Sequence, residues 1–223
     1  LNKYHKFIMK ALRNISPNVR GVEYTIQKEG DRERENKQQQ IQKPLVNNQL
    51  KLNELYINKE DNLNPKYIFD SFIVGSFNDL AHAAAQAVVK NLGTTYNPLY
   101  IYGGSGLGKT HLIQSIGNHI KNIPGKKVFY LTSDKYGSEF VDSMMNNSIH
   151  LFKEKYKKYD LLIMDDVQFF SKKDKFQEEL FHLFNSLYEN NKQMVFSSDK
   201  PPRQIANLED RLRSRFEGGM VIE

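Results

Sequence analysis

Gly103-Gly104-Ser105-Gly106-Leu107-Gly108-Lys109-Thr110 is the stretch that decides the fold, because it fits the pattern G-x-x-x-x-G-K-[ST] of a phosphate-binding loop. An apolar run at residues 98–102 precedes it, as a strand should, and residues 111–116 follow with helical spacing. The alternative is a chance glycine-rich turn, and the flanking segments argue against it. The sequence therefore predicts a binding site for a nucleoside triphosphate.

Each residue type in this loop has a physical task. Glycines at positions 103, 104, 106 and 108 permit positive φ and let bare backbone N–H groups close around phosphate oxygens. Lys109 would neutralise β- and γ-phosphate charge, and the Thr110 hydroxyl would bind Mg²⁺. The helix that follows points its positive end at the same anion. We therefore expect a nucleoside triphosphate with Mg²⁺ at this loop, and the resemblance described below implies that the nucleotides are ATP and ADP.

Length and composition fit a soluble α/β domain with a smaller part attached. The chain has 223 residues, of which 39% are hydrophobic and 26% charged. No apolar run is long enough to cross a bilayer, and no signal-peptide pattern opens the chain. The absence of cysteine excludes disulfides and cysteine-bound zinc, so a cytoplasmic location is the default. A net charge of +6 favours polyanionic partners such as nucleic acid or acidic lipid surfaces.

Three regions are expected along the chain. Residues 1–27 contain a helical and a strand pattern that look like the end of a small α+β domain, and the first residue is Leu1 rather than Met. Residues 28–63 carry balanced charges of both signs without an apolar period, and are interpreted as a flexible linker. Order resumes at residue 64 and continues to residue 223. The chain is therefore expected to be a piece of a longer protein.

From residue 64 onward, strand patterns alternate with helical patterns. Beside the strand before the loop, strands are expected at residues 127–132, 160–165 and 193–197, and helices at 77–91, 138–145 and 176–188. This alternation predicts a parallel sheet covered by helices on both faces. The expected fold class is α/β.

Acidic residues follow two of these strands. An acid at the carboxyl end of a strand beside the loop holds Mg²⁺, so we assign Asp165 to the metal and Asp166 to the attacking water. The alternative is that both acids cap a helix or face solvent. Asp199, after the next strand, is a candidate sensor of the γ-phosphate, although loops after strands often carry Ser and Asp.

Three arginines alternate with other residues at positions 211, 213 and 215. One explanation is a solvated basic face. The other is an arginine finger, which supplies charge to the phosphoryl group bound by a neighbouring subunit.

Four motifs in order resemble the DnaA family of bacterial replication initiators, a branch of the AAA+ ATPases. They read NPKYIFDSFIVG (64–75), YNPLYIYGGSGLGKTHL (96–112), LIMDDVQFF (162–170) and RLRSRF (211–216). The resemblance covers residues 64–223 and extends weakly to residues 1–27. It implies an AAA+ ATP-binding domain with slow ATP hydrolysis.

The resemblance also implies roles for matched positions. The nucleotide-binding positions would be Phe72, Val74, Gly75 and Asn78 at the adenine, with Gly103, Gly104, Ser105, Gly106, Leu107, Gly108, Lys109, Thr110 and His111 at the phosphates. Asp199 matches the first sensor, Arg215 the arginine finger and Arg211 a neighbouring interface arginine. Asp166 stands where many AAA+ proteins have Glu, and the shorter acid is typical of this slow family.

Partners follow from the same resemblance. The family carries an extra helix after its second strand that binds single-stranded DNA and helps open AT-rich origins. Val141 and Lys175 fall at positions expected to face the DNA strand. The short spacing from Val141 to Ile149 suggests that the inserted helix is slightly shorter here than in the family. The lysines at 153, 155, 157 and 158 either contribute or form an exposed helix face. Further implied partners are copies of the chain in a head-to-tail oligomer, the replicative helicase through the N-terminal domain, and acidic phospholipids.

The match ends at Glu223, just past the finger motif. The family's helical lid, second sensor arginine and C-terminal duplex-DNA-binding domain are expected to lie outside this sequence, which leaves hydrolysis by this chain open. The leading hypothesis is an ATP-dependent replication initiator. The alternatives are an AAA+ helicase loader and a regulatory switch that holds ATP and scarcely hydrolyses it.

Overall fold

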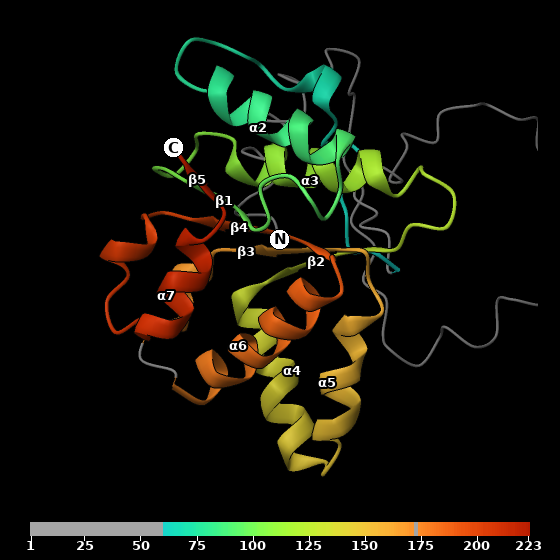
Figure 1. Ribbon diagram of the computed structural model, residues 1–223, viewed down its shortest axis with the longest axis vertical. Coiled ribbons are helices and arrows are strands. Elements are labelled where there is room, and N and C mark those ends of the chain that lie inside the picture. The colour runs from blue at the N-terminus through green and yellow to red at the C-terminus, as the bar shows by residue number, and fades with distance from the viewer. Residues whose placement is uncertain (1–59, 172–173) are drawn as a thin grey trace, which may run out of the picture. The chain divides into compact units, whose positions relative to one another are not determined.

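A five-stranded parallel sheet organises residues 60–171 and 174–223, the part of the chain that the structure, a computed structural model, describes (Figure 1). The strand order is β2-β3-β4-β1-β5. The strands are β1 (Leu99–Tyr102), β2 (Val128–Thr132), β3 (Leu161–Asp165), β4 (Gln193–Ser198) and β5 (Met220–Ile222). The expected α/β class and parallel sheet are confirmed, whereas β5 was not predicted from the sequence. The expectations for residues 1–27, and for the linker up to residue 59, lie outside the described residues.

Helices cover both faces of the sheet. Helices α2 (Asp79–Lys90) and α3 (Lys109–Ile120) lie on one face, and α4 (Ser133–Met145), α5 (Ile149–Lys157), α6 (Asp174–Glu189) and α7 (Asp210–Glu217) on the other (Figure 1). Short 3₁₀ turns complete the elements at η3 (Phe69–Ser71), η4 (Val167–Phe170) and η5 (Pro202–Gln204). None of the helices in the described residues is long and apolar enough to span a membrane.

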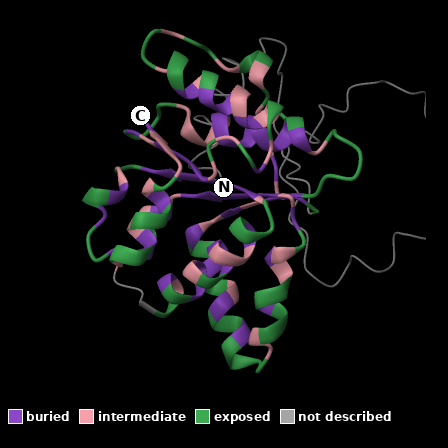
Figure 2. Cartoon of the chain, viewed as in Figure 1, coloured by how far each residue is buried: buried purple, intermediate pink, exposed green. Residues whose placement is uncertain are grey.

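Alternate side chains of the central strands build two separate cores. Ile163 and Val195 pack with α2 and α3, whereas Met164 and Phe196 pack with the helices of the other face. Every residue of β3 and β4 is buried, which explains the apolar runs Leu161–Met164 and Met194–Phe196 within them. Figure 2 shows the buried residues gathered on the sheet and on the helix surfaces turned toward it.

The strand register places the site. Thr132 of β2 pairs with Asp165 of β3, and Tyr102 of β1 pairs with Ser198 of β4, so the carboxyl ends of these strands meet at one edge. Ligands of such sheets bind at this edge. The strand ends thus bring together the loop after β1 and the acid at the end of β3.

Helix α4 begins earlier than the sequence predicts, at Ser133 rather than at residue 138. The Thr132 hydroxyl accepts a hydrogen bond from the Lys135 amide at 3.3 Å, which caps the helix directly at the end of β2. A second helix, α5, then returns the chain to β3. Two helices, α4 and α5, thus connect β2 to β3, the region where the resemblance implies an extra helix.

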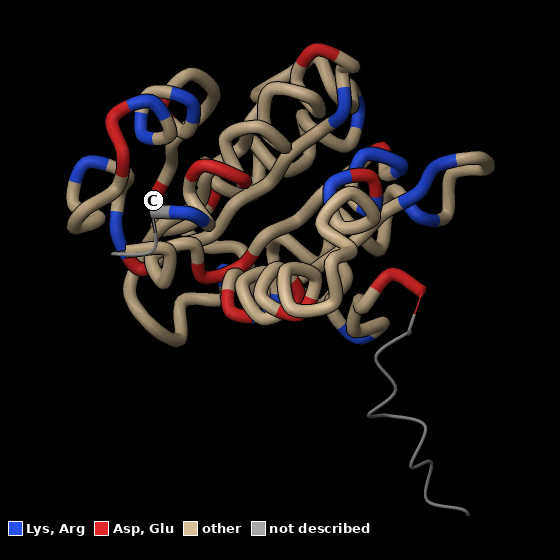
Figure 3. Tube along the Cα trace, turned by 90° about the horizontal axis from the view of Figure 1, so that it is seen from below, with Lys and Arg blue, Asp and Glu red and all other residues tan. Residues whose placement is uncertain are grey.

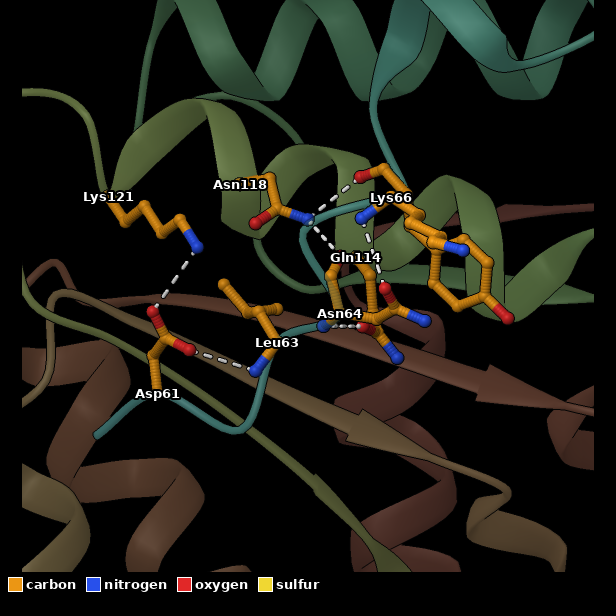
Figure 4. A network of polar contacts seen from close by, with 8 residues as sticks. Asp61, Leu63, Asn64, Lys66, Gln114, Asn118 and Lys121 are labelled. Atoms are coloured by element: carbon orange, nitrogen blue, oxygen red, sulfur yellow. Dashed lines mark hydrogen bonds and ion pairs between the residues drawn. The ribbon is translucent and has the colours of Figure 1, made fainter. Parts of the chain in front are cut away.

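Residues 60–72, here called the lead-in segment, form hydrogen bonds with both β2 and α3. The Tyr130 amide donates to the Asp61 carbonyl at 2.9 Å, and Leu63 is fully buried. On α3, the Gln114 Oε1 atom accepts from the Asn64 amide at 2.8 Å, and Asn118 donates to the Asn64 carbonyl at 2.8 Å (Figure 4). Residues 60–63, which are assigned to the linker from the sequence, thus pack against the domain.

Candidate nucleotide-binding site

The glycine-rich loop joins β1 to α3 and takes backbone conformations that other residues disfavour. Gly106 has φ 81° and Gly108, the N-cap of α3, has φ 85°. Gly103 also has positive φ, but Gly104 is not among the positive-φ glycines, so that expectation is wrong for one of the four. The Lys109 ammonium donates to the carbonyls of Gly103 and Gly104, each at 2.8 Å. The lysine therefore lies against the loop at the positive end of α3.

The two residues predicted to hold magnesium are hydrogen-bonded to each other. The Thr110 hydroxyl donates to Asp165 Oδ2 at 2.8 Å, and Asp165 is only 2% exposed. Because the hydroxyl donates a hydrogen bond to the carboxylate, the lone pairs of the hydroxyl oxygen remain available to bind a cation. The described residues contain no cluster of three or more His, Cys, Asp or Glu that would hold a metal alone. This donor set fits Mg²⁺, which usually takes one or two protein oxygens with waters and phosphate.

Two further side chains hold Asp165, and neither was predicted for this role. Tyr130 on β2 donates its hydroxyl proton to Asp165 Oδ2 at 2.9 Å, and Ser197 on β4 donates to Oδ1. The Asp166 amide also donates to Oδ1, at 3.1 Å. Ser197 gave a weak signal as a polar residue at a strand end, but nothing in the sequence points to Tyr130. Only the pairing of three distant strands brings them together.

Asp166 adopts a left-handed backbone conformation, with φ 59° and ψ 45°, at the start of η4. Its carboxylate accepts from the Gln168 side-chain amide at 3.1 Å, while Gln168 Oε1 accepts from the Asp199 amide at 3.3 Å. Gln168 thus connects Asp166, the acid expected to act on water, to Asp199, the candidate sensor. Gln168 was not identified from the sequence as a residue of the site. Burial raises the pKa of Asp166, the Gln168 hydrogen bond opposes the rise, and the Asp165 charge adds to it.

We expect Asp166→Asn to raise the free energy of unfolding at neutral pH. The raised pKa means that the folded state favours the protonated acid, so its ionisation costs stability as the pH rises through that pKa. Asparagine cannot ionise, and it tolerates the left-handed conformation. The gain should disappear below the usual aspartate pKa of 3.8, where the acid is protonated in both states.

Urea unfolding of both proteins at neutral pH, and again below pH 3.8, measures this difference. Asp142→Asn, at an exposed position on α4, is the matched control and should change stability little at either pH. A neutral-pH stability of Asp166→Asn at or below that of the wild type contradicts the prediction.

A cavity of about 300 Å³ lies beside the loop, where the adenine is expected. Phe72 and Asn78 line it, together with loop residues 107–109, whereas Val74 and Gly75 do not. Instead, the Asn78 side chain accepts from the Gly75 amide at 2.8 Å and donates to the Ile73 carbonyl at 3.0 Å. The structure therefore brings two of the four expected adenine residues to the cavity, and the other two form the turn that Asn78 closes.

His111 contacts the lead-in segment. Its Nε2 atom lies 3.0 Å from the Ile68 carbonyl oxygen, and its ring stacks on Tyr67 with centroids 4.9 Å apart. The His111 ring also meets Phe72 edge-on at 5.3 Å. His111 thus supports the aromatic wall of the cavity without lining it.

Arg211 and Arg215 lie one turn apart on α7 and cover the same ring on α6. Their guanidinium carbons lie 4.9 and 5.8 Å from the centre of the Phe181 ring. Arg211 is ion-paired with Glu209, whereas Arg215 is exposed and forms no ion pair within the described residues. Neither arginine lines the cavity of its own subunit.

The two residues expected to face DNA lie on neighbouring helices. Val141 on α4 is 43% exposed, and Lys175 at the start of α6 is exposed. The rings of Phe140 and Phe176, their chain neighbours, meet edge-on at 5.3 Å and so bring the two positions into one region. Val141 and Lys175 therefore lie on helices that contact each other, and their role toward DNA stays a prediction.

Most lysines of the run on α5 are already paired. Lys153 lies 3.0 Å from Glu179, Lys157 lies 2.7 Å from Glu154, and Lys155 bonds Glu139. Basic and acidic positions are interspersed along the trace (Figure 3). The paired lysines favour the explanation of an exposed helix face over a dedicated nucleic-acid contact.

Comparison with known proteins gives consistent matches over the described domain. The family model described as the bacterial DnaA ATPase domain matches residues 63–223. The chromosomal replication initiator protein DnaA of Caldanaerobacter subterraneus subsp. tengcongensis is 53% identical over 162 residues, which are 72% of this chain and 37% of that protein. The chain therefore spans little more than a third of the length of this curated relative.

Two solved structures share the fold at high identity. Domain III of the Thermotoga maritima replication initiation protein DnaA has a TM-score of 0.70 and 51% identity, covering 72% of this chain and 67% of that one. A replication initiator DnaA bound to AMPPCP and single-stranded DNA has a TM-score of 0.71 and 45% identity, covering 73% of this chain and 51% of that one.

Proposed function

The chain belongs to the family of bacterial DnaA ATPase domains, and from this premise we propose that it binds ATP and Mg²⁺ at the glycine-rich loop and hydrolyses ATP slowly. The hydrogen bond between Thr110 and Asp165, beside the loop and the cavity walled by Phe72, carries the proposal. A relative at 45% identity binds AMPPCP, a triphosphate analogue, which supports the same ligand class here. The nucleotide would act as the switch of a replication initiator.

The residues of the site have separate roles in this proposal. Lys109 neutralises phosphate charge, and Thr110 with Asp165 holds the metal, which supplies further positive charge when bound. Asp166 orients the attacking water and accepts its proton, and burial makes it a stronger base because it raises the pKa of this acid. Gln168 holds the Asp166 carboxylate and contacts the amide of Asp199, the proposed sensor.

Equilibrium binding of labelled ATP and ADP to the 223-residue chain, with Mg²⁺ and with a chelator, tests the proposal. We expect saturable ATP binding that strengthens with Mg²⁺. Absence of binding by the wild-type chain contradicts the proposed function. A turnover assay on the same sample then separates a slow ATPase from a switch that only holds the nucleotide.

The surfaces outside the cavity support a proposal for assembly and DNA binding. Arg215 is exposed on α7 and does not line its own cavity, as a finger that acts on a neighbouring subunit requires. Single-stranded DNA, which the AMPPCP-bound relative also holds, would contact Val141 and Lys175. For the longer protein we propose a head-to-tail oligomer that unwinds AT-rich origin DNA in the cytoplasm. Its contacts with duplex DNA, the replicative helicase and acidic phospholipids would involve regions outside the described residues.

Arg215→Ala, in a full-length version of the protein, should leave ATP binding intact and weaken ATP-driven oligomerisation about tenfold or more. The physical reason is that the exposed guanidinium forms no ion pair within the described part of its own chain, so its charge is available to a neighbour's phosphates. Sedimentation velocity with ATP and with ADP measures the effect. Arg203→Ala, which removes another exposed arginine, is the control and should assemble normally. Loss of ATP affinity instead would place Arg215 in the site of its own subunit.

The helicase-loader alternative is not favoured. The family model and the relatives at 45–53% identity are all replication initiators of the DnaA family. The glycine-rich loop and the metal-binding Asp165 would be common to initiators and helicase loaders. The lead-in segment and the other matched motifs favour the initiator.

A further inference from the structure

The Asp165 carboxylate is held by more donors than its proposed metal role by itself explains. Thr110 and Tyr130 both donate to Oδ2, at 2.8 and 2.9 Å, while Ser197 and the Asp166 amide donate to Oδ1. A carboxylate with both oxygens engaged by donors from two strands, a helix and the next backbone amide has one orientation. Because Thr110 and Tyr130 share one oxygen, removing either donor changes the surroundings of the other.

Tyr130 is itself fixed along its whole length by the lead-in segment and by α3. Its backbone amide donates to the Asp61 carbonyl at 2.9 Å, and its carbonyl accepts from the Asn62 side chain at 3.0 Å. Its ring packs with the core beneath α2 and α3. These contacts hold Tyr130 on the edge strand β2, in the position from which its hydroxyl reaches Asp165.

Gln114 on α3 joins the same set of contacts. Its Oε1 atom accepts from the Asn64 amide at 2.8 Å (Figure 4). Gln114 is almost fully buried, so water does not compete for this bond. The lead-in segment that binds the backbone of Tyr130 is therefore itself held to α3.

We infer that Tyr130 is a positioning residue that holds Asp165, together with Thr110, in the orientation that binds Mg²⁺. The inference rests on the proposed function of this site. Partners of metal ligands that do not touch the metal commonly change metal affinity tenfold or more when removed.

The test compares two tyrosines, one whose hydroxyl contacts Asp165 and one whose hydroxyl does not. Tyr130→Phe removes a donor to Asp165, whereas Tyr136→Phe removes a buried hydroxyl for which the described residues provide no hydrogen-bond partner. ATP affinity of the 223-residue chain is measured with Mg²⁺ and with a chelator. We expect Tyr130→Phe to weaken Mg²⁺-dependent ATP binding about tenfold and to leave metal-free binding unchanged. Tyr136→Phe should match the wild type in both conditions.

The outcomes separate the inference from the proposed function. Wild-type affinity of Tyr130→Phe with Mg²⁺, or an equal loss with and without the metal, overturns the inference while the function stands. A wild-type chain that binds no ATP overturns both.

Discussion

Replacing Lys109 by alanine should lower the affinity of the chain for ATP by about 100-fold or more. The ammonium is the only charged group of the glycine-rich loop, and it lies at the N-terminus of α3 where the phosphates are proposed to bind. Each hydrogen bond from a charged donor contributes about 1.5–3 kcal/mol, and contacts to two phosphate groups would sum to roughly a 100-fold effect. Titration of labelled ATP and ADP in the presence of Mg²⁺ measures the loss.

The fold should survive this substitution. Lys109 belongs to neither hydrophobic core, and its side chain bonds only two loop carbonyls, those of the buried Gly103 and the exposed Gly104. Circular dichroism and urea unfolding should therefore match the wild type. Lys90→Ala, at an exposed position in the last turn of α2, is the control for loss of one positive charge. ATP affinity within a few-fold of the wild type for Lys109→Ala contradicts the assignment of the loop.

Phe216→Ala should lower the free energy of unfolding by about 3–5 kcal/mol, the usual cost of deleting a fully buried aromatic ring. Phe216 is completely buried, and its ring lies 4.8 Å from Phe196 and 5.4 Å from Tyr100. Its loss opens a cavity between α7 and two strands of the sheet. Urea denaturation with a common m-value measures the change.

Phe169→Ala makes the same chemical change at a half-exposed position and should cost less than about 1 kcal/mol. Only Leu212 and Phe216 anchor α7 through burial, so Phe216→Ala should also weaken ATP-driven assembly through the arginines of that helix. A cost below about 1 kcal/mol for Phe216→Ala would show that α7 does not pack on the sheet as described.

Local patterns determined the fold class and the centre of the site. The glycine-rich octet between an apolar run and a helical run can be recognised from the sequence because strand, loop and helix are contiguous in the chain. The two acids at the end of a buried strand can be recognised for the same reason, and Asp165 does lie at the carboxyl end of β3. Helix and strand positions followed from periodicity, with errors at ends such as that of α4, where a side-chain cap decides the first residue.

The phosphate-binding loop, the acid at the end of β3 and the parallel sheet that carries them could thus be predicted from the residues alone. The surroundings of Asp165 could not, because Tyr130 and Ser197 come from strands that are far apart in the chain and meet through pairing with β3. The same holds for Gln168, which connects Asp166 to the loop after β4, and for β5, a short strand completed by pairing with β1. Contacts between distant segments depend on strand order and register, which residue periodicity does not encode.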